Sequence, residues 1–163
     1  MKFYLTIILF LSISERIFCQ EFKTFDINAT IVSSPSNIYK LVFTFNADTS
    51  IYAISMFHDT SQNNVLIPIE IIFTEDENIK LIDKWIEKPK SKQYNHWAMG
   101  TGSFIRQKTT YTQAFTLKKN DDFVKLIEVF YQAVTERNAY PPTTLFFEIR
   151  KSKNGLTIKK VIK

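Results

Sequence analysis

The sequence is poor in cysteine, histidine and glycine, and each shortage excludes a class of protein. Its 163 residues include one Cys, two His and three Gly. Three Gly and five scattered Pro are too few for a collagen-like or low-complexity chain. The hydrophobic share of 45% is that of an ordinary globular protein and argues against intrinsic disorder. The length suits one domain.

The single cysteine, Cys19, follows a segment typical of a signal peptide. A positively charged start precedes the apolar run Phe3–Ile13, which is too short for a membrane-spanning helix of about 20 residues. We expect cleavage after Cys19, so that residues 1–19 are a signal peptide and residues 20–163 are an exported domain, periplasmic or secreted. The alternative is a lipid anchor on Cys19, which the bulky Phe18 before it disfavours.

Without Cys19 the chain has no thiol, and this limits its chemistry. Residues 20–163 can form no disulfide, no thiolate nucleophile and no cysteine metal site. A zinc site needs three or four ligands, whereas His58 and His96 are the only histidines. We therefore expect no metal and no cofactor. No later apolar run approaches the length of a membrane span, and the net charge of +5 is modest.

The rest of the chain has the pattern of short β-strands. Residues Tyr39–Phe45 alternate apolar and polar side chains with a period of two, which is typical of a half-buried strand. Lys153-Asn154-Gly155 predicts a hairpin turn, and the charged run Glu87–Lys92 predicts a solvated loop. Further strands are predicted over Phe22–Ile31, Ile51–Phe57, Val65–Phe73, Ile79–Ile86, Phe104–Leu117, Leu145–Ile149 and Leu156–Val161. Short strands with turns every ten or so residues predict an all-β, immunoglobulin-like antiparallel sandwich.

Segment Asp121–Tyr140 fits two interpretations. Phe123, Leu126, Ile127 and Phe130 fall at helical spacing, and Asp121 suits a helix cap. The segment is also rich in Val, Ile, Phe and Tyr, which favour strands. The pattern alone leaves strand and helix open over residues 121–134.

Residues 131–144, with the sequence YQAVTERNAYPPTT, resemble the active-site strand and loop of the N-terminal periplasmic domain of the thiol:disulfide interchange protein DsbD. That pattern has an aromatic residue, a variable pair, Cys, four or five residues, a second Cys, Tyr or Leu, and Pro-Pro. Further matches lie upstream, in the family's order, at Leu41-Val42-Phe43-Thr44, Ile67-Pro68 with Phe73, Glu87-Lys88-Pro89-Lys90 and Tyr111-Thr112-Gln113. The resemblance covers about residues 25–150. It implies an immunoglobulin-like β-sandwich and a strand over residues 123–134.

The sequence departs from that family at the two residues that carry its chemistry. The family's cysteines fall on Val134 and Ala139, which have no ionisable group and cannot replace a thiolate. We therefore expect no catalytic residue and no disulfide reductase activity. What the resemblance still implies is a face for a periplasmic protein partner, formed by Val134, Ala139, Tyr140, Pro141 and Pro142.

Two alternative functions remain open from the sequence. The chain could be an accessory component of periplasmic thiol–disulfide exchange or of cytochrome c maturation, with a partner supplying the sulfur atoms. It could also be a secreted carbohydrate-binding sandwich, with an aromatic platform built from Trp85, Tyr94, Trp97 and Phe104. The basic C-terminal segment, from Arg150 onward, is interpreted as lysine protection of an edge hairpin rather than as a nucleic-acid or membrane site.

Overall fold

The computed structural model describes residues 24–34, 36–47, 49–58, 67–96 and 100–162. The predictions of a signal peptide, of cleavage or lipidation at Cys19 and of a role for Trp97 lie outside these residues. No helix occurs in the described ranges, so none there is long and apolar enough to cross a membrane. The strands are β1 (Asp26–Ser33), β2 (Ile38–Asn46), β3 (Tyr52–Ile54), β4 (Glu70–Ile72), β5 (Ile79–Lys88), β6 (Lys92–His96), β7 (Gly100–Arg106), β8 (Thr109–Leu117), β9 (Phe123–Tyr131), β10 (Thr143–Ser152) and β11 (Gly155–Val161).

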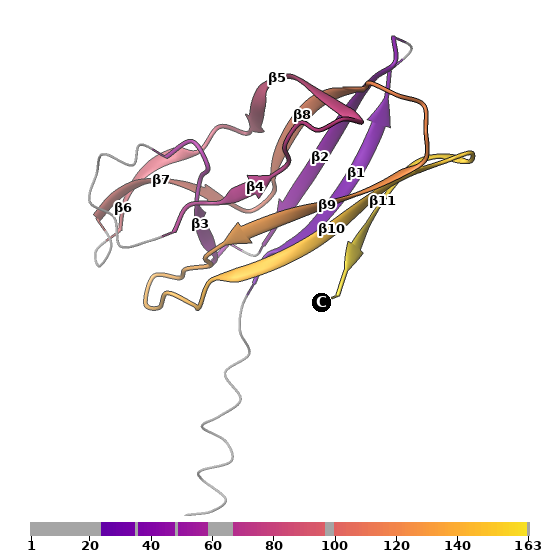
Figure 1. Cartoon of the computed structure of the whole chain (residues 1–163). Helices are drawn as coiled ribbons and strands as arrows, with labels where there is room; N and C mark the ends of the chain where they lie inside the picture. The colour runs from indigo at the N-terminus through magenta and orange to yellow at the C-terminus, as the bar shows by residue number, and fades with distance from the viewer. Residues whose placement is uncertain (1–23, 35, 48, 59–66, 97–99, 163) are drawn as a thin grey trace, which may run out of the picture.

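The strands form three antiparallel sheets. One sheet has the order β1-β2-β8-β5, and a second has the order β11-β10-β9-β4. These two sheets pack face to face, and a smaller sheet of order β3-β7-β6 lies at one end (Figure 1). The connection between β9 and β10 turns at that same end, whereas the β10–β11 turn lies at the opposite end (Figure 1).

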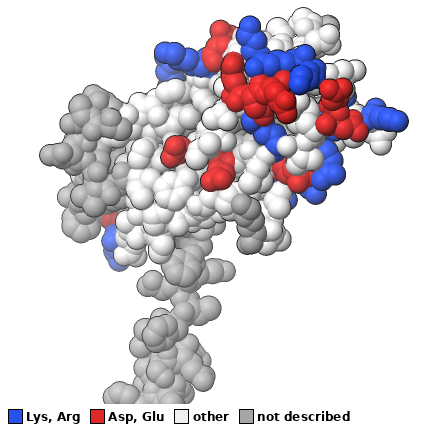
Figure 2. All heavy atoms as spheres, viewed as in Figure 1, with Lys and Arg blue, Asp and Glu red and all other residues white. Residues whose placement is uncertain are grey.

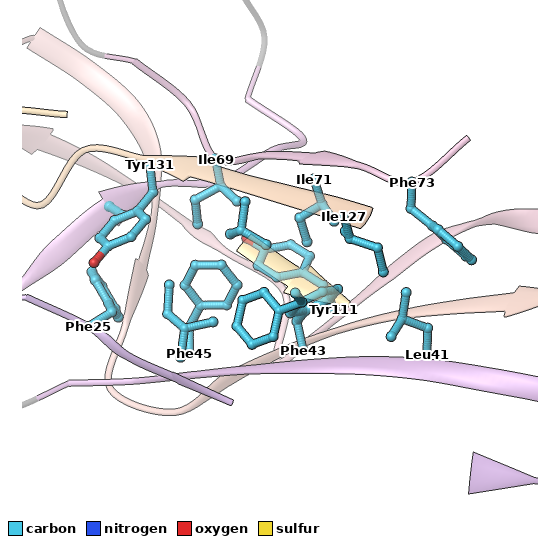
Figure 3. Close-up of a cluster of buried hydrophobic side chains, with 14 of the residues drawn as sticks. Phe25, Leu41, Phe43, Phe45, Ile69, Ile71, Phe73, Tyr111, Ile127 and Tyr131 are labelled. Carbon is cyan, nitrogen blue, oxygen red and sulfur yellow. The ribbon is translucent and has the colours of Figure 1, made fainter. Parts of the chain in front are cut away.

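Aromatic side chains fill the space between the two large sheets. Leu41, Phe43 and Phe45 of β2 are fully buried because they share one face of an alternating strand. The ring centroid of Phe43 lies 5.1 Å from that of Phe147 on β10, in an edge-to-face pair. Phe45 makes similar pairs with Tyr111 at 5.4 Å and Tyr131 at 6.2 Å (Figure 3). Each such ring contributes about 1.5–3 kcal/mol when it is removed from water.

The structure confirms the predicted all-β, immunoglobulin-like antiparallel sandwich. It also decides the ambiguous segment, because residues Phe123–Tyr131 form strand β9 between β4 and β10. Burial of Ile127, Val129 and Tyr131 against the opposite sheet favours a period of two over the helical spacing. The predicted hairpin is confirmed by β10 and β11, with Gly155 at a φ of 112°, a conformation that favours glycine.

Three details of the sequence prediction are wrong. The predicted strand over residues 104–117 is two strands, β7 and β8, joined by a turn in which Gln107 has a φ of 54°. Strand β6, which is polar and mostly exposed, was not predicted. The predicted solvated loop Glu87–Lys92 begins inside β5, and Glu87 is only 6% exposed. Glu87 is buried because it continues the inward face of β5 and meets Tyr111 across the ladder.

Candidate functional site

A closed hairpin joins the end of β9 to β10 and holds Val134 opposite Ala139. The two residues form an antiparallel bridge. On one side of the pair the Thr135 amide donates to the Asn138 carbonyl at 2.8 Å, and on the other the Tyr140 amide donates to the Ala133 carbonyl at 2.9 Å. Val134 and Ala139 are therefore a non-hydrogen-bonded pair, in which Cα atoms lie about 4.5 Å apart.

Strand β3 fixes this hairpin to the sandwich. The amides and carbonyls of Tyr52 and Val134 exchange two hydrogen bonds, each of 2.9 Å. Val134 is 1% exposed and packs in a small apolar cluster with Tyr52, Ile54 and Phe104. One member of the bridged pair is thus part of a core, whereas the other, Ala139, is exposed.

The side chain of Gln132 ties the segment after the hairpin to the segment that precedes β4. Its amide nitrogen donates to the Tyr140 carbonyl at 2.9 Å, and its amide oxygen accepts from the Ile67 amide at 3.2 Å. Tyr140 packs in part against the main core, while Pro141 and Pro142 are exposed. Proline has a fixed φ and no amide donor, so this exposed stretch stays extended.

A hollow of about 490 Å³ opens beside the hairpin. Its walls come from the segment before β3 and from the hairpin itself. The lining residues are Thr49, Ser50, Tyr52, Thr135, Glu136, Arg137, Asn138 and Tyr140. Hydroxyl, amide and charged groups therefore surround an aromatic base.

An arginine stacked on two tyrosines lies next to this end of the molecule. The guanidinium carbon of Arg106 is 4.0 Å from the ring centroid of Tyr52 and 4.9 Å from that of Tyr94. Arg106 also donates a hydrogen bond to the Tyr52 hydroxyl. The two tyrosine rings stack on each other with centroids 5.9 Å apart. A fixed cation–π arrangement of this kind holds a positive charge in place at the surface.

Of the five residues of the predicted binding face, Ala139, Pro141 and Pro142 are exposed and Tyr140 is half-buried, whereas Val134 is buried and offers no surface to a partner. Val134 and Ala139 face each other, and Tyr140, Pro141 and Pro142 follow directly along the chain. The sequence did not single out Tyr52, Gln132 or Arg106. Residue spacing alone gives no sign of them, because they come from three separate strands or loops that only the fold brings together.

The other candidates from the sequence lie apart from this site. Trp85 packs on the main core beside Phe43, so it does not form a platform with Tyr94 and Phe104, which contact each other and Tyr52. The imidazole of His58 accepts a hydrogen bond from the Ser103 amide at 3.2 Å. Within the described ranges no three His, Cys, Asp or Glu side chains gather in a group that could hold a metal ion.

The basic tail is partly paired. Glu148 on β10 accepts from Arg150 at 3.0 Å and lies 3.5 Å from Lys159 on β11. The hydrogen bond from Arg150 lowers the pKa of Glu148. Strand β11 pairs with β10 alone in its sheet, which agrees with the interpretation of its lysines as protection of an edge.

Comparison with known proteins gives one structural likeness and no sequence match. No known family matches the sequence, and no curated protein matches it. The chain is similar to the crystal structure of the Neisseria meningitidis DsbD N-terminal domain in the reduced form, with 13% sequence identity and a TM-score of 0.47. The match covers 85% of this chain and 91% of that one. Membership of the family stays a prediction.

Proposed function

We propose that this chain is an exported binding module that recognises a protein partner through the β9–β10 end of its sandwich, and that it does so without thiol chemistry of its own. The observation that carries this proposal is the closed hairpin in which Val134 and Ala139 face each other beside the 490 Å³ hollow. The hairpin is held by backbone hydrogen bonds on both sides and by β3. Its surface is therefore preorganised, which lowers the entropy lost on binding.

The distribution of charge supports docking at this end. In Figure 2, Lys, Arg, Asp and Glu gather at the end of the sandwich that carries the β10–β11 turn, whereas the surface over β4 and β9 is mostly uncharged. The hairpin itself exposes one charge of each sign, Glu136 and Arg137. The centres of protein interfaces are depleted in charged side chains and enriched in Tyr and Arg. The site offers Tyr52, Tyr140 and Arg137 around its hollow and exposes Ala139 and Pro141 beside it.

Partner capture from the native cell envelope tests this proposal. The double variant Ala139→Arg with Tyr140→Ala places a long cation at the exposed position and removes the adjacent ring. We expect it to lose the proteins that the wild-type chain retains. The matched control is Asn154→Arg, which adds the same charge at the exposed β10–β11 turn. An unchanged set of captured proteins for the double variant would remove this face from the account.

The accessory role in thiol–disulfide exchange is the second candidate, and it is carried by the same end of the molecule. A purified chain that uses no sulfur of its own cannot reduce insulin, since the attacking species in that reaction is a thiolate. We therefore expect insulin turbidity to follow the buffer control. Reduction of insulin by the purified chain alone would contradict the non-enzymatic assignment.

A further inference from the structure

A buried carboxylate near the end of β5 takes no part in the proposed function. Glu87, near the end of β5, is 6% exposed. One carboxylate oxygen accepts hydrogen bonds from the Ser55 hydroxyl and from the Tyr111 hydroxyl, the latter at 2.7 Å. The other oxygen accepts from the Ser91 amide. Ser55 and Tyr111 are themselves fully buried.

These hydrogen bonds satisfy the geometry of the carboxylate but not its charge. An ionised carboxylate has about four acceptor positions, and the three donors leave one open. All three donors are neutral groups. No Lys or Arg forms an ion pair with Glu87 within the described ranges, although Lys90 is close by in sequence. A buried charge without a cation is costly, so the site gains from a positive partner.

A pocket of about 390 Å³ gives such a partner access to Glu87. Its lining is Phe57, Ile86, Glu87, Lys90 and Ser91. Phe57 is 49% exposed and Ile86 is 52% exposed. Two apolar side chains, one carboxylate and the Lys90 side chain therefore line a space of the size that small ligands occupy. None of these residues lines the hollow beside the β9–β10 hairpin.

Tyr111 gives the site a fixed shape. It is fully buried, its ring centroid lies 6.3 Å from that of Phe57, and it sits opposite Glu87 in the β5–β8 ladder. Burial raises the pKa of Tyr111, and the negative charge of Glu87 and their hydrogen bond raise it further. The hydroxyl therefore remains a donor to Glu87 at all physiological pH values. The carboxylate is thus held in one orientation before any ligand arrives.

We infer that this pocket binds a small amphipathic amine, with its ammonium group at Glu87 and its apolar body between Phe57 and Ile86. The inference is independent of the proposed function, because the two sites share no lining residue. An ammonium group supplies both the missing charge and a donor for the open acceptor position of Glu87. Lys90 is the competing cation of the chain itself, and its removal strengthens binding.

The test uses two probes of nearly equal shape, one of which ends in a charged group and the other in a neutral one. Phenethylammonium chloride carries the charge, and phenethyl alcohol is its neutral counterpart. Titration of the ¹⁵N-labelled protein is followed through the amide signals of Phe57 and Ser91. For a ligand of this size we expect a Kd of about 1 mM for the ammonium probe. The alcohol is expected to bind about tenfold more weakly, which corresponds to about 1.4 kcal/mol.

Three variants separate a built site from unspecific binding. Glu87→Gln is expected to lower the affinity for the ammonium probe about tenfold and to leave the affinity for the alcohol unchanged. Lys90→Gln is expected to raise the affinity for the ammonium probe. Glu70→Gln, on the exposed strand β4, is the control and is expected to change neither. Equal binding of the two probes to the wild-type chain would overturn the inference without any variant. So would the absence of shifts at Phe57 and Ser91 up to about 50 mM probe, or an equal loss of affinity in the control.

Discussion

Two pockets of this molecule, the hollow beside the β9–β10 hairpin and the pocket at Glu87, are built on opposite principles. At the β9–β10 end, backbone hydrogen bonds close a hairpin whose facing residues, Val134 and Ala139, have no ionisable group. At the end of β5, side-chain hydrogen bonds from Ser55 and Tyr111 hold the buried carboxylate of Glu87. The first site owes its shape to the path of the chain. The second owes its shape to polar side chains that have no substitute, so the two respond differently to mutation.

The largest effect is expected from breaking the polar cluster. Glu87→Ala leaves the Ser55 and Tyr111 hydroxyls and the Ser91 amide without their acceptor. Each unsatisfied buried group costs about 1–3 kcal/mol, so the free energy of unfolding should fall by about 3 kcal/mol. Urea unfolding followed by circular dichroism measures this. Glu148→Ala, whose partners lie at the surface, should shift the midpoint far less. Equal shifts of the unfolding midpoint in the two variants would mean that the buried cluster contributes no more stability than the surface ion pairs of Glu148.

A pair of cysteines at the hairpin is expected to show the second largest effect. In Val134→Cys with Ala139→Cys the Cα atoms lie at the spacing of a non-hydrogen-bonded pair, which lies within the range that a disulfide spans. We expect an intramolecular disulfide, seen by mass spectrometry as the loss of two hydrogens. For so short a loop it should stabilise the oxidised protein by about 2 kcal/mol over the reduced one. Cysteines that stay reduced in an oxidising buffer would contradict the hairpin geometry.

Removal of one hydroxyl sharpens the comparison further. Tyr111→Phe keeps the core packing but takes away one of the three donors to Glu87, at a cost of about 1.5 kcal/mol. It also changes the response to alkali. Because the pKa of Tyr111 is raised in the folded protein, its contribution is complete below about pH 10 and is lost as the pH rises above that value. The variant should therefore lose less stability than the wild type between about pH 9.5 and pH 11.

Burial also raises the pKa of Tyr131, so some alkaline loss remains in that variant. Unfolding curves recorded at both ends of the interval separate the two contributions. An identical alkaline loss in the wild type and in Tyr111→Phe would show that Tyr111 ionises as freely in the folded protein as in the unfolded one.

The smallest effect is expected at a carboxylate nearer the surface. Asp76 lies 2.6 Å from the Lys125 amine and accepts from the amides of Asn78 and Ile79. Burial pushes the pKa of Asp76 upward, but these hydrogen bonds and the lysine charge outweigh it, and the pKa lies below its usual value. Its contribution is therefore present above about pH 4 and is lost as the pH falls below that value.

For the partly exposed Asp76 the contribution is about 0.5 kcal/mol after solvent screening. Asp76→Asn should remove it at neutral pH and leave the stability at about pH 2 unchanged. Thermal unfolding at the two pH values measures the difference. A loss as large as that of Glu87→Ala would contradict the distinction between a buried and a surface carboxylate.

Sequence patterns predicted the sheets well and the polar site poorly. The alternation in Tyr39–Phe45 placed β2 correctly because burial of one face depends only on neighbours along the strand. In β5 the alternation is interrupted by a register shift between Ile82 and Ile86, and the charge of Glu87 favours a loop over a strand end. Its burial depends on Ser55 and Tyr111, which come from other parts of the chain. No local pattern records such a contact.

The candidate binding end was predicted through resemblance rather than through physics of the residues. Val134 and Ala139 are ordinary apolar residues, and nothing in their spacing predicts that they face each other. The bridge depends on the turn between them and on Tyr52, which lies far away in sequence. Gln132 likewise acts through a hydrogen bond to Ile67, a contact between distant parts of the chain.

Site-specific photo-crosslinking tests the central claim, that this chain binds a protein through the β9–β10 end, most directly. A benzophenone amino acid is placed at Ala139 in one protein and at Asn154 in another, both exposed and at opposite ends of the sandwich. After illumination in the native envelope, the account predicts a discrete protein adduct from position 139 and none from position 154. Adducts from position 154 alone, or the same adducts from both positions, would contradict it.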